Sequence, residues 1–200
     1  HPSDVYLLGD HLLVAPVIEE GATSRKVLLP EGTWIDFFDG STYQGGQSVT
    51  IESPLSKIPV LTRAGSLLPT LRPTIASMLP GTGGLMFDAM NDDANPLWVL
   101  MTPGNPSEFA LYDGTILKQE TVTDTIRVER IKGSEFDGGI VIEIAAMGNS
   151  PKDVVVDGNV IEQSQSGGLP ATPTWMWKKE KNGTITVHLM SENSVVEINR

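Results

Sequence analysis

Short runs in which apolar and polar residues alternate, each closed by a turn-forming residue, most constrain the fold of this chain. In QSVTI and RKVLL the apolar side chains favour every second position, the period of a strand with one solvated face. Glu31-Gly32, Asp39-Gly40 and Gly45-Gly46 follow such runs and supply residues that adopt positive φ at low cost. We therefore predict strands over residues 12–18, 25–29, 33–38, 47–51 and 58–62.

A second series of strands follows a long interruption at residues 69–96, where prolines and glycines cluster around a short helix expected over 74–79. A loop of this length is uncommon inside one compact unit, so we place a domain boundary within it. The predicted division is a first domain at 1–80, a linker at 81–96 and a second domain at 97–200. The later strands are expected at 97–102, 108–113, 116–120, 123–131, 139–146, 153–158, 174–180, 184–190 and 195–199.

Turn chemistry supports the same fold class in the second half. Asp157-Gly158 and Asn182-Gly183 lie between apolar runs and are typical of tight hairpins. The 20 glycines and 14 prolines favour many turns over long helices. We predict an all-β chain with two antiparallel β-sandwich-like domains in series.

Charge and cysteine content exclude several classes of partner and site. The formal net charge is −11, and such an acidic surface repels phosphate backbones and anionic lipid headgroups. We therefore predict no nucleic-acid or membrane partner, whereas a neutral carbohydrate is compatible with this charge. The absence of cysteine excludes disulfides, thiolate nucleophiles and thiolate metal sites.

No catalytic, cofactor or metal site is predicted from the remaining residues. The three histidines are His1, His11 and His188, and none has the spacing of a zinc motif. His188 lies in an alternating run, where a solvated or half-buried imidazole is expected. Asp36 and Asp39 flank an aromatic pair, but Asp39-Gly40 is more simply a turn.

Two tryptophans are the only candidate ligand contacts. Trp175 and Trp177 are two residues apart and share one face of a strand. Exposed tryptophans stack on the apolar faces of pyranose rings, so this pair is a candidate sugar-stacking site. The alternative, that the pair packs in the core or against a neighbouring domain, is the more frequent use of such residues.

Several motifs in the first third of the chain occur together and in a fixed order. They are LGDHLLVAPV at residues 8–17, LPEGTWIDFFDG at 29–40 and IPVLTRAGSLLP at 58–69. This series resembles the region that follows the catalytic barrel in glycoside hydrolase family 31, the α-glucosidase and α-xylosidase group. Residues 97–115 are similar to the start of the distal C-terminal domain there, with Asp113-Gly114 in place of a longer acidic run, and His11 replaces the second acid of the common GDD.

The resemblance implies a supporting role without catalysis. In that family a (β/α)₈ barrel carries two catalytic aspartates, which work by a retaining mechanism with the carboxyl groups about 5–5.5 Å apart. None of the motifs around those aspartates occurs here, so no catalytic residue is assigned, and we expect His1 to lie near the end of that barrel in a longer chain. The expected partners are the barrel of the same parent chain and, for the parent, a neutral carbohydrate.

Two alternatives remain open from the residues alone. One is a carbohydrate-binding module that uses Trp175, Trp177 or another surface aromatic residue. The other is an adhesion or assembly sandwich unrelated to enzymes.

Overall fold

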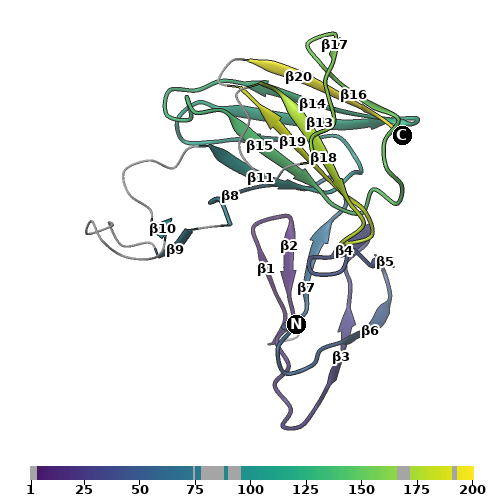
Figure 1. The fold of residues 1–200 in the computed structure, drawn as a ribbon. Helices are drawn as coiled ribbons and strands as arrows, with labels where there is room; N and C mark the ends of the chain where they lie inside the picture. Colours follow the sequence, from purple (N-terminus) through teal and green to yellow (C-terminus); the bar gives the residue numbers. More distant parts are fainter. Residues whose placement is uncertain (1–3, 74, 78–87, 90–95, 166–171, 191–192) are drawn as a thin grey trace.

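The computed structural model describes residues 4–73, 75–77, 88–89, 96–165, 172–190 and 193–200 (Figure 1). Within these ranges the chain forms strands and no helix, which confirms the predicted all-β class. The short helix expected over residues 74–79 is wrong for its described part, because Ile75–Ser77 form strand β9. β9 pairs with β10 (Asp88–Ala89).

The first unit is built from two small sheets. One has five strands in the order β1-β2-β7-β4-β5, and the other is the antiparallel pair β3 and β6. Their bounds are Tyr6–Leu8 for β1, Leu12–Val14 for β2, Ser24–Leu28 for β3, Thr33–Asp36 for β4, Thr42–Gln44 for β5, Ser48–Glu52 for β6 and Val60–Arg63 for β7. Seven buried residues between these strands form its core: Leu13, Ala15, Val27, Leu29, Trp34, Ile51 and Leu61.

The second unit is a two-layer sandwich, drawn above the first unit in Figure 1. One layer has the order β18-β19-β15-β11-β8 and the other β12-β13-β14-β20-β16-β17. The bounds are Leu67–Thr70 for β8, Leu97–Met101 for β11, Ser107–Ala110 for β12, Ile116–Val122 for β13, Thr125–Ile131 for β14, Ile140–Ile144 for β15, Asp153–Val156 for β16, Asn159–Val160 for β17, Thr174–Lys178 for β18, Thr184–Leu189 for β19 and Ser194–Asn199 for β20.

Alternation of side chains explains the core between these two layers. In β14 the inward residues Ile126, Val128 and Arg130 are buried, and the residues between them are partly exposed. Ile185, Val187 and Leu189 of β19 meet them from the other layer as part of one apolar cluster. The sandwich is therefore held by a single continuous core.

One pairing in this sandwich is parallel. β11 and β15 run in the same direction, with Leu97 opposite Ile140 and Met101 opposite Ile144. Between them the chain crosses to the other layer and forms β12, β13 and β14, so it enters both strands from the same end. The predicted antiparallel sandwich is thus confirmed with this one parallel pair.

The two units are joined closely along the chain and through space. Strand β7 belongs to the first unit, whereas β8, which starts four residues after β7 ends, pairs with β11 of the second. In the short connection the N–H of Gly65 donates to the carbonyl of Thr102 at 3.0 Å. A Cβ on Gly104 would lie 2.4 Å from the nitrogen of Gly65, so both backbones meet at glycines. The predicted domain bounds stay a prediction, since most of residues 81–96 lie outside the described ranges.

Candidate functional site

Strand β18 places both candidate sugar-stacking tryptophans against the core of the sandwich. Trp175 is only 5% exposed, and its indole N–H donates to the carbonyl of Ile161 at 3.2 Å. Trp177 is partly buried against the same cluster, and its ring covers Gly183 in the facing turn. These surroundings leave little free ring surface for a sugar on Trp175. The sugar-stacking role of the pair stays a prediction.

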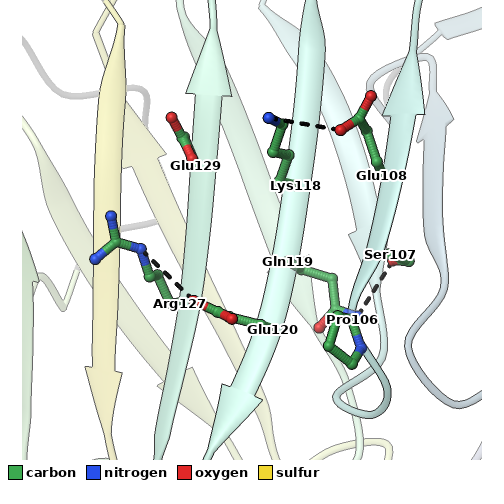
Figure 2. Close-up of a pocket in the computed structure, with 8 residues that line it drawn as sticks. All are labelled: Pro106, Ser107, Glu108, Lys118, Gln119, Glu120, Arg127 and Glu129. Atoms are coloured by element: carbon green, nitrogen blue, oxygen red, sulfur yellow. Dashed lines mark hydrogen bonds and ion pairs between the residues drawn. The ribbon is translucent and has the colours of Figure 1, made fainter.

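A shallow pocket of about 440 Å³ lies on the outer face of the six-stranded layer (Figure 2). Its charged side chains come from three neighbouring strands and alternate in sign: Glu108 from β12, Lys118 and Glu120 from β13, and Arg127 and Glu129 from β14. The register sets this pattern, because Lys118 stands opposite both Glu108 and Glu129, and Glu120 stands opposite Arg127.

Ion pairs within the pocket occupy both of its cations. Lys118 Nζ lies 3.5 Å from Glu108 Oε2, and Arg127 reaches Glu120 at 3.9 Å and Glu197 at 3.3 Å. All five side chains are between 42% and 56% exposed, so these pairs are screened by solvent. Opposite charges at paired positions favour strand pairing, and the pocket is best explained as a cross-strand charge ladder.

A second charged cluster lies in the first unit and extends from the buried Asp36 to the exposed Asp39. Lys57 Nζ is 2.9 Å from Asp36 Oδ2 and 3.1 Å from Asp39 Oδ2. Asp36 Oδ1 also accepts from the backbone N–H of Phe38 at 2.8 Å, which fixes the turn after β4. The carboxylates that flank the aromatic pair therefore hold a turn and a lysine.

The pKa shifts in this cluster follow from its hydrogen bonds. Burial raises the pKa of Asp39, but hydrogen bonds from Ser41 and Lys57 outweigh it and hold the pKa below its ordinary value. Burial lowers the pKa of Lys57, but the hydrogen bonds to Asp36 and Asp39 outweigh it and raise the pKa. Asp39 and Lys57 are thus charged near neutral pH, and their contacts with Asp36 make the cluster a structural anchor.

The described histidines form no cluster. His188 is 7% exposed on β19, so the expectation of a solvated or half-buried ring is wrong, and burial lowers its pKa. β19 is buried at all six positions because both of its faces are covered. In the described part of the chain, no group of three or more His, Asp or Glu side chains is placed to hold a metal ion. No helix in the same ranges is long and apolar enough to span a membrane.

The N-terminal apolar surface, as we call the exposed side chains of Tyr6, Leu7, Leu8 and Leu28, lies on the exterior of the first unit. Each of these residues is between 48% and 65% exposed. Val5, Tyr6, Leu7 and Leu28 also line a hollow of about 520 Å³ between β1 and β3. Leu13 and Ala15, which follow β1 in the chain, are buried in the core and are not part of this surface.

The comparisons with known proteins assign a family to the first third of the chain. Residues 1–68 match the family model described as the glycosyl hydrolase family 31 C-terminal domain. The resemblance predicted from the motifs is therefore confirmed, and the chain carries a family 31 C-terminal domain in its first third.

Two curated relatives agree with this assignment. Over 64 residues the chain is 48% identical to a 1,3-alpha-isomaltosidase of Kribbella flavida and 39% identical to an isomaltosyltransferase of Sporosarcina globispora. Each match covers 32% of this chain, but only 9% of the first protein and 6% of the second. The chain therefore spans a small part of the length of these relatives.

Similarity in fold extends over nearly the whole chain. A family 31 dextranase of Flavobacterium johnsoniae, solved in complex with glucose, superposes with a TM-score of 0.75 at 24% sequence identity. The match covers 98% of this chain and 27% of the dextranase. The dextranase therefore contains a region with the fold and arrangement of both units.

Some site residues carry no signal in the sequence. Lys57 lies 21 residues from Asp36, and no local pattern indicates that they meet. Tyr112, which is 85% exposed beside Asp113-Gly114, lies in residues 97–115, which resemble the start of the distal C-terminal domain, but that resemblance assigns it no role. An aromatic residue next to a turn could have been singled out as exposed, because turns lie at the surface.

Proposed function

We propose that this chain forms non-catalytic C-terminal β-domains of a retaining family 31 α-glycosidase and supports the catalytic barrel of its parent. The parent hydrolyses α-glycosidic bonds in oligosaccharides. The observation that carries the proposal is the N-terminal apolar surface, which lies within the segment that matches the family.

Strand β1 gives the physical reason that this surface needs a cover. Tyr6, Leu7 and Leu8 are all exposed, and β1 pairs with β2 alone at the edge of its sheet. An exposed apolar edge strand is a template for aggregation unless another element covers it. Because these three side chains and Leu28 are about half exposed, covering them would stabilise the protein by roughly 1 kcal/mol for each side chain.

The charge clusters are consistent with support of a neighbouring domain. Lys118 and Arg127 are paired with carboxylates, and Lys57 is held by Asp36 and Asp39. A general acid and a nucleophile need carboxyl groups free to exchange a proton or attack the substrate. The proposed task of the chain is to hold the barrel and the loops around its active site.

A first test is the intact mass of the native polypeptide that carries this sequence. The proposal expects a product several times larger than the 21.5 kDa of these residues, with a barrel on the N-terminal side. A native product of about this mass would contradict it.

A second test separates support of the barrel from the stability of these units themselves. Leu8→Asp is expected to lower the thermal stability and activity of the parent, but to leave the isolated 200-residue chain folded and less prone to self-association. Val160→Asp is the matched control, because Val160 is 72% exposed on β17, far from this surface in the fold. Equal tolerance of both variants in the parent would overturn the proposal.

A further inference from the structure

A second hollow of about 560 Å³ lies where the two layers of the sandwich open at their edges. Its walls come from the edge strands β8 and β12 and from β11, through Pro69, Leu97 and Phe109. The volume lies in the range of small-molecule sites in proteins. Among the described residues, the hollow shares no lining residue with the charge ladder or with the hollow in the first unit.

Tyr112 stands at the rim of the hollow with its ring free. It is 85% exposed. Among the residues that line the hollow in the described ranges, it is the only large apolar one that is exposed. The ring of Phe136 lies 6.3 Å away in an edge-to-face arrangement and is itself buried. One aromatic face is thus presented to solvent and supported from the side.

Hydrogen bonds fix the backbone that carries Tyr112. The next residue, Asp113, accepts from the N–H of Thr115 at 3.0 Å and from the N–H of Glu135 at 3.2 Å. Its carbonyl accepts from the N–H of Ser134 at 3.1 Å. These bonds hold the turn at Asp113 against the loop before Phe136, so the backbone next to Tyr112 is fixed before a ligand binds.

Polar groups on the neighbouring loop lie close to the turn that follows Tyr112, since the N–H of Glu135 donates to Asp113. Ser134 and Glu135 are exposed, and the Ser134 hydroxyl donates to Glu135 Oε1 at 3.2 Å. The other oxygen of that carboxylate and the Tyr112 hydroxyl can bond to a ligand. An aromatic face beside hydroxyl and carboxylate groups suits a pyranose ring, which has an apolar face and a polar edge.

We propose that the Tyr112 hollow is a surface binding site for a neutral saccharide. The sugar ring stacks on Tyr112, and its hydroxyls bond to Glu135 and to the tyrosine hydroxyl. A neutral ligand also suits a chain of net charge −11. A covering protein surface is the less suitable occupant, because Leu97 is buried and Phe109 and Leu111 are partly buried against the core, in contrast to the exposed side chains of the N-terminal apolar surface.

The test is a titration of the 200-residue chain with maltotetraose and with isomaltotetraose, followed by amide NMR shifts. We expect saturable shifts at Tyr112, Gly114 and Glu135 with at least one sugar, and a dissociation constant in the millimolar range. Tyr112→Ala should weaken binding about fivefold or more, and Tyr112→Phe, which keeps the stacking ring and loses only the hydroxyl, should weaken it by about two- to fourfold.

Tyr6→Ala is the matched control, since it removes an equally large exposed ring from the other unit and should leave sugar affinity unchanged. The proposal is overturned if neither sugar gives saturable shifts, or if the shifts survive Tyr112→Ala. Shifts at Tyr112 that change on dilution without sugar would indicate a second copy of the chain as occupant and would also overturn it. Support of the barrel is tested separately through Leu8, so failure of one proposal leaves the other standing.

Discussion

Removal of the Lys57 ammonium group tests how much the stability of the first unit depends on its ion pair with the buried Asp36. Asp36 is 1% exposed, and the Lys57 side chain is 18% exposed. Lys57→Met keeps most of the aliphatic stem of the side chain and removes the charge that faces Asp36 at 2.9 Å. The carboxylate is then left buried without its cation.

The expected cost follows from what Asp36 keeps. Breaking a buried pair by removing one partner costs about 3–5 kcal/mol. Asp36 still accepts from the N–H groups of Phe38 at 2.8 Å and Asp39 at 3.3 Å, and water reaches the site past Lys57. We therefore expect the free energy of unfolding to fall by about 2–3 kcal/mol, which corresponds to a melting temperature lower by about 4–12 °C.

Thermal unfolding at pH 7, followed by circular dichroism, measures this loss. At that pH the contribution of Lys57 is fully present, since its raised pKa means that stability is lost only as pH rises through the folded value, above 10.5. Lys118→Met is the control, because its pair with Glu108 is about half exposed and is expected to contribute about 0.5 kcal/mol or less. If both variants lose the same stability, the reasoning about Asp36 is refuted.

A double variant sharpens the same test. Asp36→Asn removes the buried charge that Lys57 neutralises. If the two groups act as a pair, Lys57→Met should cost clearly less in the Asp36→Asn background than in the original chain. Additive losses would mean that Lys57 stabilises the unit through contacts other than Asp36, such as its pair with Asp39.

Further variants probe other parts of the structure. Gly183 and Gly158 both have positive φ, but a Cβ on Gly183 would lie 2.3 Å from the Trp177 ring and one on Gly158 would meet nothing within 4 Å. We expect Gly183→Ala to destabilise by about 1–3 kcal/mol more than Gly158→Ala in urea unfolding, and equal losses would contradict the contact. Trp175→Phe should lower the free energy of unfolding by about 2 kcal/mol, since it removes buried ring atoms and the hydrogen bond to Ile161. A loss below about 0.5 kcal/mol, the size typical of an exposed site, would argue against the burial of Trp175. Burial raises the pKa of Asp113, but hydrogen bonds from Thr115 and Glu135 outweigh it and lower the pKa, so its stability contribution is present above pH 3.8 and is lost as pH falls through the folded pKa. Asp113→Asn should therefore flatten the acid side of the stability curve, and an unchanged slope would refute this.

Much of the strand pattern could be predicted from local sequence. Strands β13 and β14 alternate almost perfectly between buried and partly exposed positions, and the structure places both where the sequence predicts them, within two residues. The Asp157-Gly158 turn has positive φ at both residues and joins β16 to β17 as a tight hairpin. The family resemblance was also readable, because three motifs in order lie within residues 1–68.

The short edge strands and their partners were not predictable in the same way. β1 and β5 have three residues each, too few for a period to show. β8 includes a proline and looks like the start of a linker, yet it pairs with β11 as the edge strand of the sandwich.

Local sequence specifies most of the longer strands and the turns between them, because these depend on backbone preferences and side-chain periods within a few residues. The family of the first third follows from three motifs in a fixed order. The burial of His188, the contact of Lys57 with Asp36 and the exposure of Tyr112 follow from the tertiary structure alone. The physical reason is that burial depends on which distant segment covers each face, and no local pattern carries that information.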